Sequence, residues 1–125
     1  MPASHRRHVL VVEDDASLRE LLALRLRLLG VETTSVESVP EAIAALEGAQ
    51  VDAVLSDYSL PGPTGLDLLA YVHGSRPLVP FILMTAVLEP ELQARALAEG
   101  AEAVYDKRDL LPLVPHLFEH VRAAA

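Results

Sequence analysis

Short runs of aliphatic residues alternate along this chain with longer segments of helical periodicity. The first run, Val9 to Val12, is continuous and too short for a helix, so it predicts a strand buried on both faces. The predicted strands are residues 9–12, 31–36, 51–56, 78–84 and 103–105, and the predicted helices are residues 16–29, 39–47, 66–72, 90–99 and 110–123. This alternation predicts an α/β fold, a doubly wound parallel sheet with helices on both faces.

Capping residues and glycines indicate where several of these segments begin and end. Ser38 to Glu41 matches a capping box with proline in the first helical turn, so we expect Ser38 to cap the second helix. Gly74 follows the third helical segment, and we expect it to end that helix. Pro80 lies near the start of the fourth strand, where a missing N–H is tolerated.

Composition narrows the class of protein. The chain has 125 residues, 51% of them hydrophobic, which predicts a single domain over residues 1–125 with ordered structure over residues 8–123. It has no cysteine, which excludes disulfides, cysteine-based zinc sites and thiol catalysis. The net charge of −8 argues against direct nucleic-acid binding. No apolar run is long enough for a membrane helix and no signal region precedes the first strand, so we expect a cytoplasmic protein with no membrane contact.

Polar residues gather where the predicted strands end. Glu13 and Asp14 follow the first strand, Asp57 the third, Thr85 the fourth, and Lys107 the fifth. Function in an open parallel sheet gathers at the carboxyl ends of the strands, near the switch in strand order. If the strand order is 2-1-3-4-5, the first and third strands are neighbours, and the carboxylates of Asp14 and Asp57 share one pocket with Glu13 close by.

Such a pocket has a definite chemistry. Two carboxylates about 4 Å apart repel by roughly 4 kcal/mol at an effective dielectric constant near 20, and a hard divalent cation such as Mg²⁺ relieves that repulsion. An ionised Asp57 can act as a nucleophile and form an aspartyl phosphate. Thr85 offers a hydroxyl, and Lys107, the chain's single lysine, offers a compact cation for phosphoryl oxygens. Taken alone, acidic residues after a strand more often mark the start of a helix. Only their combination with Asp57, Thr85 and Lys107 favours a functional site.

The chain resembles a response-regulator receiver domain over its whole length. The residues that carry the resemblance are Val11-Val12-Glu13-Asp14-Asp15, Ser56-Asp57 through Gly65, Met84-Thr85-Ala86, and Gly100-Ala101 leading to Lys107. The resemblance implies a five-stranded, flavodoxin-like receiver fold with strand order 2-1-3-4-5. It also implies that Asp57 is the phosphoacceptor and that Thr85 and Lys107 contact the phosphoryl group. Glu13, Asp14, Asp57 and the backbone carbonyl of Ser59 would bind Mg²⁺ or Mn²⁺.

The sequence departs from the family pattern in two positions. Arg108 follows Lys107 where the family usually has a proline in a cis peptide bond. A non-proline cis bond costs roughly 2.5–4 kcal/mol, so we predict a trans bond and a rearranged loop before the last helix. Val104 occupies the position where the family usually has the switch aromatic, and Tyr105 lies one position further on. Either a bulge turns Tyr105 inward or the usual coupling between threonine and aromatic is absent or altered; the alternation of strand side chains favours the second.

The function implied is that of a phosphorylation switch in a two-component system or phosphorelay. A histidine kinase or a histidine phosphotransfer protein would donate the phosphoryl group, and an unknown downstream protein would read the altered face. We expect a monomer or weak homodimer without an attached output domain, and no enzymatic activity beyond self-phosphorylation and self-dephosphorylation.

Three alternatives remain open. A degenerate receiver would act only as a protein-interaction module. A phosphatase with an aspartate nucleophile needs an acid two residues further on, where this chain has Ser59. A flavodoxin-type phosphate site is disfavoured because residues 13–15 would repel an anion.

His116 and His120 have a zinc-compatible spacing without a third ligand, so we expect them to be solvated. Leu111 and Phe118 are either core residues or part of a partner surface.

Overall fold

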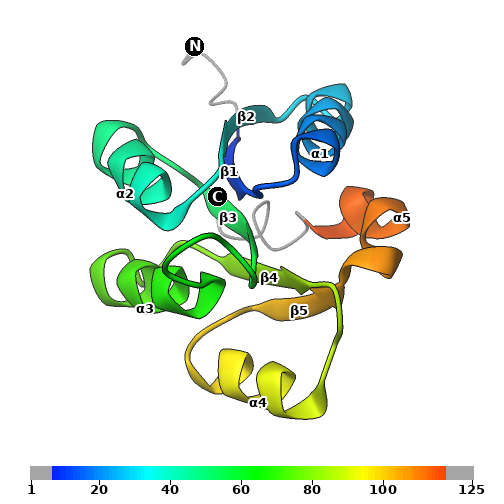
Figure 1. Ribbon diagram of the computed structural model, residues 1–125. Helices are drawn as coiled ribbons and strands as arrows, with labels where there is room; N and C mark the ends of the chain where they lie inside the picture. Colours follow the sequence, from blue (N-terminus) through cyan, green and yellow to red (C-terminus); the bar gives the residue numbers. More distant parts are fainter. Residues whose placement is uncertain (1–6, 118–125) are drawn as a thin grey trace.

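The computed structural model describes residues 7–117, which form a parallel sheet with helices on both faces (Figure 1). The strands are β1 (His8–Val12), β2 (Glu32–Val36), β3 (Ala53–Asp57), β4 (Phe81–Thr85) and β5 (Ala103–Asp106). The helices are α1 (Ala16–Leu28), α2 (Val39–Gly48), α3 (Gly65–Ser75), α4 (Pro90–Ala98) and α5 (Lys107–Leu117). The five strands lie in the order β2-β1-β3-β4-β5 with parallel pairing, as predicted.

Alternate residues of β1, β3, β4 and β5 enter two separate hydrophobic clusters, one on each face of the sheet. Leu10 and Leu83 belong to the cluster beneath α2 and α3, which also takes Ala96 of α4. Val11 and Met84 belong to the cluster beneath α1 and α5. Figure 1 shows these two pairs of helices on opposite sides of the sheet, with α4 beside β5. The four strand residues named are fully buried, which confirms strands covered on both faces.

The helix caps differ from the sequence prediction in α2 and α3. Ser38 precedes α2, but its hydroxyl donates to the Glu41 carboxylate at 3.4 Å and accepts no bond from the helix backbone. Ser38 is therefore the N-cap residue of α2, as predicted, but the predicted capping box is wrong because the Ser38 side chain makes no capping bond. A reciprocal box occurs at α3, where the Thr64 hydroxyl accepts from the backbone N–H of Asp67 and the Asp67 carboxylate accepts from that of Thr64. Gly74 lies inside α3 and does not end it.

Gly65 holds α3 close to the end of β3. A Cβ atom at this position would overlap the backbone carbonyl oxygen of Asp57 and lie within 2.9 Å of Leu83. The backbone N–H of Gly65 donates to the carbonyl of Tyr58 at 2.8 Å. The absence of a side chain at Gly65 therefore lets the helix start pack directly against the strand that carries Asp57.

The junction between β5 and α5 is tighter than predicted. The helix begins at Lys107 itself, directly after the strand, so the predicted rearranged loop before residue 110 is absent. The Lys107–Arg108 peptide bond is trans, as predicted. The predicted helix end near residue 123, with Phe118 and His120, lies outside the described residues.

Strand β5 pairs with β4 in unbroken register, with Met84 opposite Tyr105 and Thr85 opposite Asp106. No bulge interrupts it, so Tyr105 packs against the cluster of α1 and α5 while Val104 enters the opposite cluster. The alternative in which a bulge turns Tyr105 to the other face is therefore wrong. Within residues 7–117, no helix is long and apolar enough to cross a membrane.

Candidate functional site

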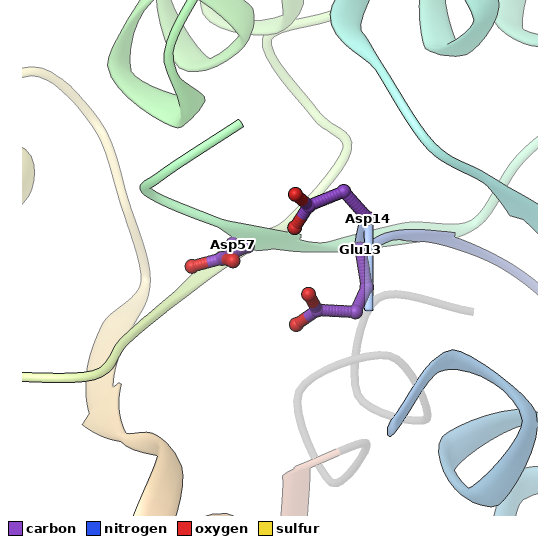
Figure 2. A group of neighbouring side chains, drawn as sticks. All are labelled: Glu13, Asp14 and Asp57. Atoms are coloured by element: carbon purple, nitrogen blue, oxygen red, sulfur yellow. The ribbon is translucent and has the colours of Figure 1, made fainter. Parts of the chain in front are cut away.

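Three carboxylates meet where β1 and β3 end. The two strands are paired with Val12 opposite Ser56, so the residues that follow each of these positions emerge side by side. Glu13 and Asp14 follow β1, and Asp57 is the last residue of β3. Figure 2 shows the side chains of Glu13 and Asp14 extending from the end of β1 toward the side on which Asp57 lies. Each contributes an oxygen, and these oxygens all lie within 4.8 Å of one another.

Lys107 brings a positive charge into this group. Its ammonium nitrogen lies 2.7 Å from Oδ2 of Asp57, to which it donates a hydrogen bond, and 2.8 Å from Oε1 of Glu13. Glu13 and Asp57 are buried, whereas Asp14 is exposed. One ammonium therefore contacts two buried carboxylates, next to which lies the exposed carboxylate of Asp14.

Burial and neighbouring charges shift the pKa values of Glu13 and Lys107. Burial raises the pKa of Glu13, the ammonium of Lys107 and the hydrogen bond from the backbone N–H of Asp15 oppose that rise, and the charge of Asp57 adds to it. Burial acts to lower the pKa of Lys107, but its hydrogen bond to Asp57, its ion pair with Glu13 and the charges of both carboxylates outweigh that effect and raise it. The ammonium of Lys107 is therefore held in its charged form.

The donor set fits a hard divalent cation. Oε1 of Glu13 is buried without a hydrogen-bond partner in the described part of the chain, and its contact with Lys107 is an ion pair at 2.8 Å. Three carboxylates with an exposed member, Asp14, offer the oxygen ligands that Mg²⁺ prefers and leave room for its water ligands. These residues could therefore hold Mg²⁺.

The other residues predicted for the site border this cluster. Oδ1 of Asp57 accepts a bond from the backbone N–H of Ser59 at 3.2 Å, so the chain after Asp57 folds back over the carboxylate. The role of the Ser59 carbonyl as a metal ligand stays a prediction. Thr85 is buried at the end of β4, and its hydroxyl donates to the backbone carbonyl of Val87 at 3.2 Å. The structure thus brings Glu13, Asp14, Asp57 and Lys107 together, while the hydroxyl of Thr85 is engaged with the following loop.

Sequence reasoning missed the residues that shape the acidic loop. Asp15 is the N-cap of α1, and its carboxylate accepts from the backbone N–H of Ser17 at 3.0 Å. The guanidinium of Arg19 donates to the backbone carbonyls of Glu13 at 2.9 Å and Asp14 at 3.4 Å. The helix-start interpretation of the acidic triplet is thus correct for Asp15, while Glu13 and Asp14 face the site. The position of Arg19, one helical turn after the start of α1, was the signal in the sequence that could have indicated this contact.

The sequence matches the family described as response regulator receiver domain over residues 9–112. It is 38% identical over 93 residues to the DNA-binding transcriptional regulator NtrC of Salmonella typhimurium, covering 74% of this chain and 20% of that protein. It is 36% identical over 110 residues to the response regulator protein FleR of Pseudomonas aeruginosa, covering 85% of this chain and 23% of that protein. The chain thus spans about a fifth of the length of these two curated relatives.

Solved structures share the fold. The signal receiver domain of a putative LuxO repressor protein from Vibrio parahaemolyticus superposes with a TM-score of 0.88 at 26% identity, covering 96% of this chain and 93% of that one. A CheY-like response regulator receiver domain protein from Methanospirillum hungatei superposes with a TM-score of 0.85 at 26% identity, covering 97% of this chain and 100% of that one. The order of strands and helices is therefore that of known receiver domains.

Proposed function

This chain belongs to the response regulator receiver domain family, and from that premise we propose that it is a switch operated by phosphorylation of Asp57. The observation that carries the proposal is the position of the Lys107 ammonium, 2.7 Å from a carboxylate oxygen of Asp57 and beside the acidic pair from β1. A cation that contacts two buried carboxylates beside a third, exposed one suits the handling of a phosphoryl group, whose negative charge has to be balanced as it arrives.

In the proposed reaction, a carboxylate oxygen of Asp57 attacks the phosphorus of the donor. The new bond joins that oxygen to phosphorus, and the bond from phosphorus to the leaving group breaks with its electron pair on the leaving group. Lys107 balances charge on the phosphoryl oxygens, and the hydroxyl of Thr85 donates to one of them after leaving the carbonyl of Val87. Glu13, Asp14, Asp57 and the Ser59 carbonyl would hold Mg²⁺, which when bound neutralises carboxylate charge and draws in phosphoryl oxygens.

The same proposal describes how phosphorylation of Asp57 would change the surface of the protein. When the Thr85 hydroxyl turns toward the phosphoryl group, it gives up its hydrogen bond to the carbonyl of Val87, and the loop after β4 is released to change position. The surface formed by α4, β5 and α5 then changes shape, which a partner protein can detect. Receiver domains interact with histidine kinases or phosphotransfer proteins, and we propose such a donor in the cytoplasm, together with a downstream protein of unknown identity.

A small phosphodonor such as acetyl phosphate tests the proposal directly. Incubation of the chain with this donor and Mg²⁺ is expected to add one phosphoryl group, detected by intact mass, that is labile to hydroxylamine as an acyl phosphate is. Asp57→Asn should abolish the adduct. Asp109→Asn, which removes an exposed carboxylate from the first turn of α5, is the matched control and should leave it.

The outcomes separate the proposal from its alternatives. No adduct on the wild-type chain, with or without Mg²⁺, would contradict the switch and favour a receiver that acts only through protein contacts. An adduct that persists in Asp57→Asn would assign the acceptor to another residue. Continuous hydrolysis of a generic phosphate ester would favour the phosphatase alternative. Such an enzyme needs an acid two residues after its nucleophile, where this chain has Ser59.

A further inference from the structure

The carboxylate of Asp106 lies at the junction that sets the position of Lys107. Asp106 ends β5, directly before Lys107, which begins α5. Asp106 is only 5% exposed, and its Oδ1 accepts a bond from the backbone N–H of Arg108 at 2.8 Å. A side-chain oxygen that accepts from the second helical residue is the bonding pattern of a helix N-cap. Asp106 therefore caps α5 and fixes the backbone on both sides of Lys107.

Arg108 adds a second link to the same carboxylate. Its Nε lies 3.0 Å from Oδ1 of Asp106, and its Nη2 lies 2.8 Å from Oδ2, a bidentate pair. The side chain of Arg108 is 83% exposed, so solvent screens the pair and the backbone bond is the part shielded from water. These hydrogen bonds from the Arg108 side chain and backbone lower the pKa of Asp106 to about 2, with a smaller contribution from the backbone of Leu88.

The composition of α5 makes this cap more important than an average one. Pro112 and Pro115 lie inside the helix, and a proline has no N–H to donate to the carbonyl four residues earlier. The carbonyls of Arg108 and Leu111 therefore lose their usual partners, and the first turns of α5 have fewer backbone bonds to hold them. Packing of Leu110 anchors the next turn to the core, but Lys107 lies before that anchor.

We propose that Asp106 is a positioning residue for Lys107: by capping α5 it holds the ammonium of Lys107 on Asp57 and Glu13. The reach of the ammonium to both carboxylates, at 2.7 and 2.8 Å, depends on where the first turn of α5 starts. Without the cap, that turn frays and the ammonium samples other positions. This inference rests on the proposed function, since it assigns Lys107 a part in phosphoryl transfer.

Two substitutions separate capping from charge. Asp106→Asn keeps an oxygen that can accept from the Arg108 backbone but removes the negative charge. Asp106→Glu keeps the charge but is longer and is not a favoured cap residue. The initial rate of phosphorylation by acetyl phosphate is expected to fall about tenfold or more in Asp106→Glu, because small displacements of a catalytic group are costly, and to stay close to wild type in Asp106→Asn. Magnesium affinity, measured by calorimetry, should be the same in all three proteins.

A second readout reports on Lys107 without any phosphoryl chemistry. Lys107 is the single lysine of the chain, so ¹³C-lysine labelling gives one Cε signal. That signal is expected to shift in Asp106→Glu toward the position of a solvated lysine and to stay at its wild-type position in Asp106→Asn. Asp106→Ala is a smaller non-capping variant that should behave as Asp106→Glu does, so a failure of either one to fold leaves the other. Thermal unfolding identifies the folded variants.

Arg108→Ala is the matched control, because it removes the exposed ion pair and keeps the backbone donor of the cap. It should retain the wild-type rate and lysine signal. The proposal is overturned if Asp106→Glu and Asp106→Ala keep the wild-type signal, or if Asp106→Asn or Arg108→Ala loses it. A wild-type chain that accepts no phosphoryl group would remove the proposed function, while the lysine signal would still decide whether Asp106 positions Lys107.

Discussion

The ammonium nitrogen of Lys107 lies 2.7 Å from Oδ2 of Asp57, although 50 positions of sequence separate the two residues. The contact joins the end of β3 to the start of α5 across β4, which lies between β3 and β5 in the sheet. It also brings the ammonium to Glu13, whose buried carboxylate it approaches to 2.8 Å. The stability of this corner of the molecule therefore depends on a cation that the acidic cluster shares.

Removing that cation should destabilise the protein when no metal is present. Lys107→Met leaves the buried carboxylates of Glu13 and Asp57 without a counter-charge. Breaking a fully buried pair costs about 3–5 kcal/mol, and we expect about 1–3 kcal/mol here because the side chain of Lys107 is 22% exposed. Urea unfolding in buffer with a chelator measures the difference. Added Mg²⁺ should restore more stability to the variant than it adds to the wild type.

The control for this prediction is an ion pair on the surface. Arg95 and Glu99 form a pair in which both side chains are substantially exposed, so Arg95→Met should change the free energy of unfolding by less than about 1 kcal/mol. Equal losses in Lys107→Met and Arg95→Met would contradict the picture of a buried shared cation.

Two glycines of α3 should respond in opposite directions to alanine. Gly65→Ala places a methyl group against the Asp57 carbonyl and Leu83, and such overpacking typically costs about 1–3 kcal/mol. Gly74 has no atom within 4 Å of where a Cβ would lie, so Gly74→Ala should leave stability unchanged or raise it by up to about 1 kcal/mol. Chemical denaturation of both variants checks this. A stable Gly65→Ala protein would mean that α3 can move away from β3 at little cost.

The caps of α2 and α3 provide a third comparison. Thr64→Ala removes the hydroxyl that accepts from the backbone of Asp67, and loss of such a cap costs typically about 1 kcal/mol. Ser38→Ala removes a hydroxyl that caps nothing, and it should be close to neutral. Unfolding free energies of the two variants measure the contrast. A larger loss for Ser38→Ala would restore the capping box expected at that position.

The pH dependence of stability should carry the signature of Asp106. The pKa of this carboxyl is lowered from an ordinary value of 3.8 to about 2 by its bonds with Arg108. A folded-state pKa below the unfolded value contributes stability that is fully present above the unfolded value and is lost as the pH falls toward the folded one. The difference in unfolding free energy between wild type and Asp106→Asn should therefore be constant above pH 4 and shrink between pH 4 and 2.

Urea unfolding at a series of pH values measures this difference, and the ¹³C signal of the Asp106 carboxyl gives the pKa directly. Arg108→Ala should move the midpoint of that signal upward, toward 3.8. A midpoint that stays near its wild-type value in Arg108→Ala would show that the guanidinium is not the main cause of the lowered pKa.

The order of strands and helices was predictable because it depends on local patterns. Continuous apolar runs such as Val9 to Val12 and the helical spacing between them extend over only a few residues each. The hydrogen bonds at the start of α2 and the end of α3 were less predictable. At Ser38 the Glu41 carboxylate takes the hydroxyl as a donor, and at Gly74 the helix continues because Arg76 still donates to the carbonyl of Val72.

The members of the candidate site were also visible in the sequence, since each follows a predicted strand. The start of α5 was not, because it depends on the side chain of Asp106 turning back to the Arg108 backbone. Aspartate side chains are mostly exposed in proteins, and nothing in the local pattern distinguishes a buried cap from a solvated charge.

The sequence by itself determined the kinds of elements, their order, and which chemical groups stand at the ends of the strands, because hydrophobic periodicity acts within a few residues of the chain. Only the tertiary structure decided that the ammonium of Lys107 contacts Asp57 and Glu13, that Glu13 is buried and Asp14 is exposed, and that Asp106 caps α5. Those relationships arise when segments far apart in sequence are packed together, and distances of a few ångströms then set the charge and the bonding of each group.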